Sequence, residues 1–173
     1  MVGHSMTPIY YIRPPVADDY QALMMLEQVD AIGTEIAMNL KSKEEWLKCI
    51  STYEHSRVFV DTTSEDKIWG YHLTAQVEDN LYIKEFFISK PYRSRENSTE
   101  NKKLEGFGGL DKKPLYTICK TAKLLGGKVI APIASDNNTA ISAMLGLYGF
   151  VLEQTLPEWF ENGKDCNIYT WDN

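Results

Sequence analysis

Two arginines and a group of glycines flank a polar loop in the middle of the chain. Arg93 and Arg95 open this stretch, and Gly106, Gly108 and Gly109 close it. Small residues at the start of a helix let backbone N–H groups approach phosphate oxygens, and guanidinium groups add charge-assisted hydrogen bonds. These residue types indicate a site for a pyrophosphate group. The other interpretation is a surface loop whose glycines only turn the chain.

The residues between the arginines and the glycines do not suit a phosphate-binding loop. Glu96 follows the arginines directly, and its carboxylate would repel a phosphate while its side chain blocks close approach of the backbone. The stretch 96–113 also exceeds the roughly 12–15 residues of most connections without secondary structure. Two hypotheses therefore stay open: a phosphate-binding loop with a polar insertion, or the remnant of such a loop.

A carboxylate within an apolar strand is the best candidate for acid–base chemistry. Glu85 lies in the run Leu81–Ser89, which is rich in β-branched and aromatic residues. Strict alternation places Glu85 on one face with Leu81, Ile83 and Phe87. Burial on that face would raise the pKa of Glu85 towards the range of a general base.

Glu85 has a second interpretation, and its neighbours offer weaker candidates. The carboxylate can instead pair with Lys84 or Lys90 at a strand edge, or turn to solvent at a bulge. Tyr71 and His72 on the preceding strand are weaker alternatives for acid–base chemistry, because a single histidine in a strand is more often structural.

The first third of the chain predicts one strand and two helices. Ile9–Pro15 is rich in β-formers and ends at two prolines, and Asp18 or Asp19 can cap the helix that follows. Ser42 and Glu45 have the spacing of a capping box and predict the start of a second helix. The apolar stripes at helical spacing are Ala22, Met25, Leu26 and Val29 in the first helix, and Trp46, Cys49, Ile50 and Tyr53 in the second.

Strands dominate the middle of the chain. Arg57–Asp61, Ile68–Val77 and Leu81–Ser89 are β-branched and aromatic runs separated by short polar turns. Such short turns predict three antiparallel neighbours.

The last third alternates between helices and strands. Pro114 suits the first turn of a helix that Gly126 and Gly127 end, and Pro132 argues for an edge or bulge position in the next strand, Lys128–Ala134. The buried stripe expected in that helix is Leu115, Ile118, Cys119 and Ala122. A further helix over 139–147 and strands over 150–155 and 167–171 complete the pattern.

This order of elements predicts a single α/β (α+β) domain over residues 1–173. We expect a mixed, mostly antiparallel sheet of about six to seven strands flanked by about four helices. In it Leu81–Ser89 should be a central strand, with Lys128–Ala134 beside it in parallel and the two splayed apart near their ends. Residues 1–7 are expected to be a disordered N-terminal tail or an expression scar, and residues 96–113 a long loop.

The chain resembles the Gcn5-related N-acetyltransferase (GNAT) superfamily in the order of its elements. Two segments carry the specific part of the likeness: Ile88–Arg95 (ISKPYRSR) and Ala134–Phe150, which joins an asparagine, a helix and a Gly-Phe pair. The glycine positions of the family's loop fall on Glu96 and Ser98, so the chain looks like a divergent member with an altered pyrophosphate loop. The resemblance implies acetyl-CoA as co-substrate and an amine of a small molecule or a protein as acceptor.

The resemblance also implies roles for particular residues. The backbone of Ile88 would polarise the thioester carbonyl, and the donor-binding set would be Phe87, Ile88, Arg93, Arg95, Gly106, Gly108, Gly109 and Asn138. Family members often place a tyrosine on the fourth helix to protonate the leaving thiolate, and that position holds Leu145 here. Tyr148 is the nearest substitute and would share the catalytic role with Glu85. The alternative is that Tyr148 is a core aromatic residue.

Composition excludes some classes of function. The net charge of −6 disfavours tight binding to a phosphate backbone, so nucleic acid is an unlikely partner. Three separated cysteines indicate reduced thiols, and three histidines without ligand spacing give no metal site. No apolar run has the length of a membrane span, and we expect a cytoplasmic monomer or homodimer.

Three functions remain as hypotheses. The first is an acyl-CoA-dependent N-acetyltransferase. The second is a catalytically inactive GNAT-like binding or structural protein that has lost the acyl-CoA site, and the third is a nucleotide-binding regulator that uses the same loop.

Overall fold

A computed structural model describes residues 10–30, 40–89, 114–134, 148–159 and 163–172. Within these residues seven strands form one sheet, in the order β1-β2-β3-β4-β5-β7-β6. The strands are β1 Tyr10–Arg13, β2 Arg57–Asp61, β3 Lys67–Val77, β4 Asn80–Ile88, β5 Val129–Ala134, β6 Val151–Leu156 and β7 Cys166–Trp171. The helices are α1 Tyr20–Asp30, α2 Lys43–Thr52 and α4 Pro114–Leu125, with 3₁₀ turns η1 Ala17–Asp19 and η2 Thr62–Ser64. The predicted fold class is confirmed.

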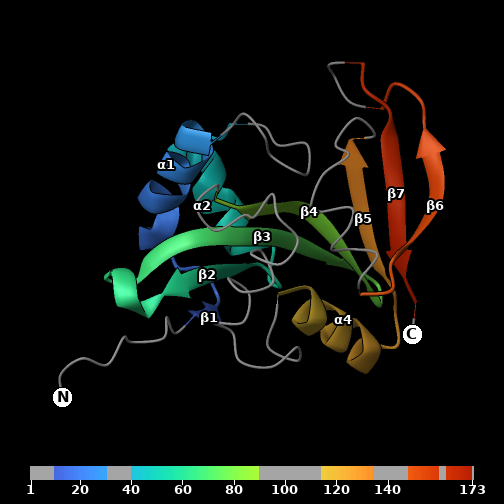
Figure 1. Ribbon diagram of the computed structural model, residues 1–173, viewed down its shortest axis with the longest axis horizontal. Helices are drawn as coiled ribbons and strands as arrows, with labels where there is room; N and C mark the ends of the chain where they lie inside the picture. Colours follow the sequence, from blue (N-terminus) through green and yellow to red (C-terminus); the bar gives the residue numbers. More distant parts are fainter. Residues whose placement is uncertain (1–9, 31–39, 90–113, 135–147, 160–162, 173) are drawn as a thin grey trace, which may run out of the picture.

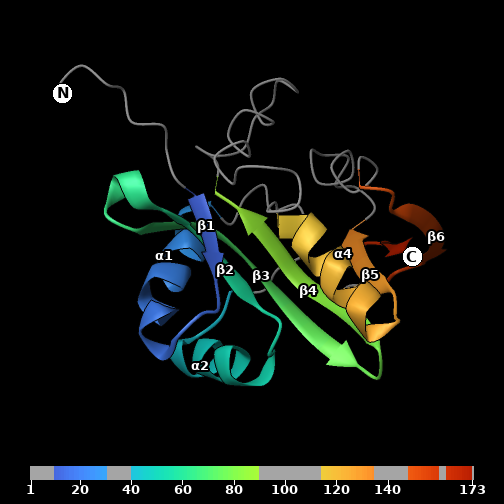
Figure 2. The ribbon, with the colours of Figure 1, turned by 90° about the horizontal axis from the view of Figure 1, so that it is seen from below.

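The helices lie on both faces of the sheet. Helices α1 and α2 cover one face of β1–β4, and α4 packs on the opposite face against β4 and β5 (Figures 1 and 2). All neighbouring strands are antiparallel except β4 and β5, which run parallel. The prediction that the strand of Glu85 is central, with the strand after α4 beside it in parallel, is confirmed.

Asp19 secures the turn between β1 and α1. Its carboxylate accepts hydrogen bonds from the backbone N–H of Val16 at 2.7 Å and from both terminal nitrogens of Arg13 at 2.8 and 2.9 Å. This ion pair lowers the pKa of the Asp19 carboxyl group against the raising effect of burial, and raises that of Arg13. The residue therefore acts at the start of the helix, as expected, although the N-cap position of η1 is Val16.

The predicted apolar stripe of α1 is wrong at two of its four positions; Leu26 packs partly buried against the core, and the side chain of Val29 lies outside the described residues. Ala22 and Met25 are exposed, whereas Leu23 and Glu27 are buried. The buried face of α1 includes a carboxylate, and a search for apolar residues at helical spacing passes over such a position. The stripe that results is rotated by about one residue, or roughly 100° around the helix.

Helix α2 follows its sequence pattern closely. The Ser42 hydroxyl accepts a hydrogen bond from the Glu45 N–H at 3.2 Å, and the Glu45 carboxylate accepts one from the Ser42 N–H at 3.1 Å. The predicted capping box is confirmed. Trp46 of the predicted stripe is fully buried, and Cys49, Ile50 and Tyr53 pack partly buried beside it.

A β-bulge in β4 corrects the predicted face of Glu85. Leu73 of β3 is opposite Glu85, but the next residue, Thr74, is opposite Ile83, so Lys84 is the extra residue on β4. An extra residue reverses the alternation of side chains beyond it. Leu81 and Ile83 therefore face α4, whereas Glu85 and Phe87 face α1 and α2.

The parallel pair between β4 and β5 is short. Two register pairs join the strands, Leu81 with Val129 and Tyr82 with Ile130, and the two strands have no further pairing among the described residues. The expectation that Pro132 marks an edge or a bulge is wrong, because β5 lies between β4 and β7 and its register with β7 has no shift. Pro132 is tolerated here because the ladder with β4 has already ended, while Pro132 remains opposite Ile168 of β7.

Helix α4 and the turn after it agree with the sequence. The predicted stripe Leu115, Ile118, Cys119 and Ala122 is buried. Gly126 has a φ of 79°, a left-handed conformation that glycine adopts without strain and that ends the helix. A Cβ on Gly127 would lie 1.7 Å from the carbonyl oxygen of Asp79, so only glycine fits where this turn meets the β3–β4 turn.

Two hydrophobic clusters occupy the two faces of the sheet. The α4-side cluster includes Phe59, Trp69 and Phe86, and the α1–α2-side cluster includes Trp46, Tyr71 and Phe87. Cys49, Cys119 and Cys166 are free thiols, as expected. The predictions for residues 1–7, the loop 96–113 and the helix over 139–147 lie outside the described residues.

Candidate active site

Glu85 lies in a buried cluster of charged and aromatic side chains between β4 and helices α1 and α2. Its carboxylate oxygens lie 2.6 and 2.7 Å from the ammonium nitrogen of Lys41. The Tyr71 hydroxyl donates a hydrogen bond to the same carboxylate at 3.0 Å. Glu85 is 8% exposed and Tyr71 is 1% exposed, so the pair is largely removed from water.

A second carboxylate completes the surroundings of the Lys41 ammonium group. Glu27 of α1 lies 3.1 Å from Lys41 Nζ and accepts a hydrogen bond from the indole N–H of Trp46. The ammonium nitrogen also lies 4.6 Å from the centroid of the Trp46 ring, which places it in cation–π contact. Two carboxylates and an indole thus contact one primary ammonium group, and the Tyr71 phenol binds one of the two carboxylates. We call these four side chains the ammonium cage.

The electrostatics of the ammonium cage depend on burial. Burial raises the pKa of Glu85, and the Lys41 ammonium and the Tyr71 hydroxyl oppose this by stabilising the carboxylate. The pKa of Tyr71 is well above its usual value, first because of burial and then because of Glu85 and Glu27. Tyr71 therefore remains a neutral hydrogen-bond donor across the physiological range.

Sequence reasoning found Glu85 and Tyr71 but missed the rest of the cage. Lys84 and Lys90 were the partners expected for Glu85. Lys84 is exposed, with its ammonium 6.0 Å from the Tyr82 ring, and Lys90 lies outside the described residues. Lys41 precedes the capping box of α2 and carries no local signal of burial. Glu27 had a detectable signal, because Leu23 and Glu27 share a helix face at i, i+4.

The donor-binding candidates can be placed only in part. Phe87 is buried and stacks on Tyr71, with ring centroids 5.5 Å apart and planes 19° apart. Ile88 is the last residue of β4 and pairs with Gly70 of β3. The remaining candidates lie outside the described residues: Arg93, Arg95, Gly106, Gly108, Gly109 and Asn138.

The structure does not bring Tyr148 and Glu85 together. Tyr148 packs partly buried against the α4-side cluster, and burial, with a smaller contribution from Cys119, raises its pKa to about 12. Glu85 faces the other side of the sheet, beside Tyr71. These surroundings agree with a core aromatic residue, and a catalytic role for Tyr148 stays a prediction.

His72, the weaker acid–base candidate, is not part of the ammonium cage. Its ring stacks against Phe86 at a centroid distance of 6.4 Å, in the α4-side cluster. The described residues contain no group of three or more His, Cys, Asp or Glu side chains that could hold a metal ion. None of the helices in the described part of the chain combines the length and the hydropathy that crossing a bilayer requires.

Solved structures with the same arrangement are acetyltransferases. Ard1 from Thermoplasma volcanium matches with a TM-score of 0.68 and 13% identity, covering 94% of this chain and 96% of Ard1. The ribosomal-protein-S18-alanine N-acetyltransferase from Escherichia coli matches with a TM-score of 0.66 and 13% identity, over 94% and 92% of the two chains. The yncA protein from Salmonella typhimurium, solved with its cofactor acetyl-CoA, matches with a TM-score of 0.66 and 14% identity, over 94% and 93%.

These matches define the class of fold. The chain has the fold of the GNAT acetyltransferases over nearly its whole length. No protein-family model matches the sequence, and no curated protein sequence matches it either. The fold is therefore shown by structure, and the chemistry has to be argued from the site.

Proposed function

We propose that the protein is an acyl-CoA-dependent N-acetyltransferase that transfers an acetyl group from acetyl-CoA to an amine of a small molecule or a protein. One observation carries the proposal: Glu85, a buried carboxylate on the central strand, binds a primary ammonium group in a cage of matched chemistry. An amine acceptor presents that same group. The ammonium of Lys41 thus marks where an acceptor would lie.

The short ladder between β4 and β5 suits an acyl-CoA donor. Beyond Tyr82 and Ile130 the two strands have no further pairing among the described residues, so backbone groups of β4 on that side lack a strand partner. The pantetheine arm of CoA carries two amides, which bind to such unpaired backbone groups. The yncA protein, with its acetyl-CoA, has the same fold, which supports this donor.

The proposed reaction moves protons at two places, the acceptor amine and the leaving thiolate. Glu85 removes a proton from the acceptor ammonium, and the neutral amine attacks the thioester carbonyl carbon, polarised by the backbone at Ile88. The carbon–sulfur bond then breaks and the thiolate takes up a proton from Tyr148 or from water. The second proton of the attacking nitrogen leaves as the amide forms and restores that donor. Burial favours Glu85 as the base because burial raises the pKa of this carboxylate towards neutrality. Lys41 must release the carboxylate when the acceptor enters.

The donor part of this proposal is tested by calorimetry. Titration of the protein with acetyl-CoA should give saturable binding, because the β4 edge and the helix start at Pro114 supply hydrogen-bond donors. Desulfo-CoA keeps the pyrophosphate and the pantetheine amides and serves as the matched probe. If neither compound binds at millimolar concentration, the proposed donor site does not exist.

The catalytic part is tested by Glu85→Gln. This variant keeps the shape of the side chain but cannot accept a proton, so turnover should fall about 10²-fold or more while acetyl-CoA affinity stays unchanged. Glu44→Gln, at an exposed position of α2, is the matched control and should retain full turnover. Unchanged turnover in Glu85→Gln would assign the base to water or to another residue.

A second candidate function is a GNAT-like binding or structural protein without acyl transfer. Two observations favour it: Lys41 already neutralises Glu85, and Glu96 stands where the family's loop has a glycine. In this case acetyl-CoA at low millimolar concentration leaves the melting temperature unchanged. Glu85→Gln then alters stability alone.

A further inference from the structure

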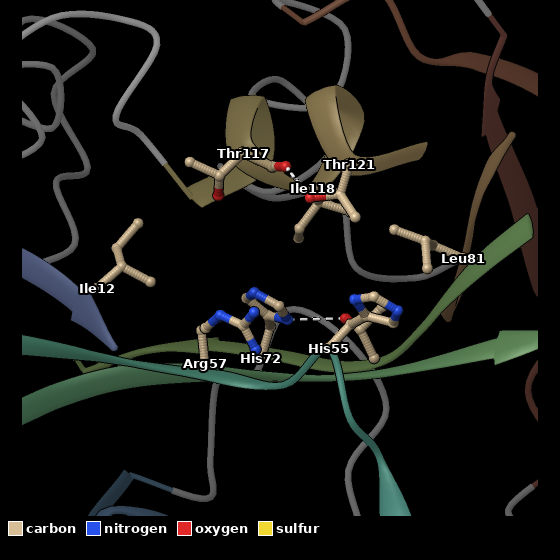
Figure 3. A pocket seen from close by; sticks show the side chains of 9 residues that line it. Ile12, His55, Arg57, His72, Leu81, Thr117, Ile118 and Thr121 are labelled. Carbon is tan, nitrogen blue, oxygen red and sulfur yellow. Dashed lines mark hydrogen bonds between the residues drawn. The ribbon is translucent and has the colours of Figure 1, made fainter. Parts of the chain in front are cut away.

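A cavity of about 240 Å³ lies between the sheet and α4, on the opposite face of the sheet from the ammonium cage. His55, Arg57 and His72 rise from the sheet side towards Thr117, Ile118 and Thr121 of α4 (Figure 3). Ile12, Thr74 and Leu81 are the other described residues of the lining. The cavity is thus built from β1, β2, β3, β4 and α4, together with His55 of the segment before β2.

His72 presents an unsatisfied nitrogen at this cavity. The residue is 1% exposed, and its Nδ1 lies 2.7 Å from the Thr74 hydroxyl oxygen, which fixes the ring. Its Nε2 has no hydrogen-bond partner among the described residues. Buried polar atoms in proteins almost always have a partner, so a group inside the cavity has to supply one.

The charged groups around the cavity favour an anion. Arg57 donates hydrogen bonds from Nη1 to the backbone carbonyls of Glu54 at 3.2 Å and Ser56 at 2.7 Å, which anchors the guanidinium group at the rim. Among the described residues the lining contains no carboxylate side chain. The carboxylate of Glu54 lies 3.8 Å from Nε2 of His55, but the Glu54 side chain is 68% exposed and directed largely to solvent. One fixed positive charge therefore faces the cavity without an acidic partner in the lining.

The remaining lining suits a ligand with a short hydrocarbon part. His55 is fixed by a 2.7 Å contact between its Nε2 and the side-chain oxygen of Gln76, and two threonine side chains of α4 lie opposite. Ile12, Leu81 and Ile118 provide apolar walls. The volume is below the roughly 300–1,000 Å³ of pockets for drug-sized ligands.

We propose that this cavity binds a small organic carboxylate, with the carboxylate at Arg57 and His72 and the alkyl part against the isoleucines and Leu81. The site lies on the other face of the sheet from Glu85, so binding there is independent of acyl transfer. A ligand that fills the cavity also links α4 to β1–β3 and stabilises their packing.

Methyl NMR with butyrate as the probe tests the site. Butyrate should shift the methyl signals of Ile12, Leu81 and Ile118 in a saturable way in the millimolar range. Butyramide has the same shape without the charge and should leave these signals in place. Equal shifts with both compounds would show that the cavity does not select the carboxylate, and no shift with butyrate at matched ionic strength would show that it holds water alone. Either result would overturn the proposal.

Three variants make the assignment specific. Arg57→Gln removes the charge and should weaken butyrate binding about tenfold or more, because it removes a charge-assisted hydrogen bond to the carboxylate. Thr121→Leu fills the cavity and should abolish binding without loss of stability, so it remains informative if Arg57→Gln fails to fold. Lys123→Gln, at an exposed position of α4, should bind butyrate normally. Wild-type affinity in Thr121→Leu would place the ligand elsewhere.

Discussion

At the scale of single residues, the Glu85–Lys41 pair determines how the ammonium cage behaves. Both side chains are about nine-tenths buried, so each charge depends on the other for the stabilisation that water would otherwise give. Burying an ion pair is often neutral for stability, but leaving one partner alone is costly. The pair is therefore more informative about the ligand that the cage can accept than about the stability of the fold.

Lys41→Met should destabilise the protein by about 3–5 kcal/mol at neutral pH, because it leaves Glu27 and Glu85 buried without a cation. Urea unfolding at pH 7 measures the loss. Lys48→Met, at an exposed position of α2, is the control and should change the free energy of unfolding little. A loss below about 1 kcal/mol in Lys41→Met would mean that the pair is exposed to water.

The same variant has a defined pH dependence. Without Lys41 the pKa of Glu85 rises further above its usual value of 4.5, because burial then acts with less opposition. An acid whose pKa is higher in the folded state than in the unfolded state stabilises the fold at a pH below its unfolded pKa. This stabilisation is lost as the pH rises through the folded pKa. The difference between Lys41→Met and wild type should therefore shrink as the pH falls towards 4.5.

His72 should make the protein less stable in acid. Burial, followed by Arg57 and His55, lowers the pKa of His72 from 6.5 to about 3. Between these values the unfolded chain binds a proton that the folded chain does not, so stability falls with decreasing pH by up to about 1.4 kcal/mol per pH unit. His72→Phe keeps an aromatic ring beside Phe86 and should flatten the slope of unfolding free energy between pH 6 and 4. An unchanged slope would assign acid sensitivity to the carboxylates.

At the scale of secondary-structure elements, the sequence predicted where helices and strands lie better than which of their faces are buried. The capping box of Ser42 and the glycines after α4 are local signals, and the structure confirms both. Strict alternation in β4 failed because the bulge at Lys84 depends on pairing with β3, which no single strand encodes. The prediction of the buried face of α1 was wrong in part because the burial of Glu27 depends on Lys41 and Trp46, which lie in other parts of the chain.

Gly127→Ala should test how closely the turns after β3 and α4 are packed. The new Cβ would overlap the carbonyl group of Asp79, and backbone atoms have to move to admit it. We expect a loss of about 1–3 kcal/mol in the free energy of unfolding, typical of overpacking. Lys128→Ala changes an exposed neighbour and should cost much less. Equal stability of the two variants would show that the turns separate easily.

At the scale of the whole molecule, the sheet consists of two antiparallel parts joined by one short parallel ladder. Strands β1–β4 form one part and β5–β7 the other (Figure 1). The order of elements in the sequence predicted this architecture, including the parallel junction. The site could be predicted less completely, because the ammonium cage combines residues from α1, α2, β3 and β4 around Lys41 of the segment before α2.

The short junction also has a consequence for the order of folding. Strands β2, β3 and β4 pair through tight turns, whereas the junction joins Asn80 to Lys128, 48 residues apart, through a 2.9 Å hydrogen bond. Contacts between distant residues require more loop-closure entropy and tend to form late. The part formed by β2, β3 and β4 should therefore form the folding nucleus, and the junction should close after the transition state. In stopped-flow experiments Val129→Ala should mainly accelerate unfolding, whereas Val60→Ala in β2 should mainly slow folding. A slower folding rate in Val129→Ala would place closure of the junction in the rate-limiting step.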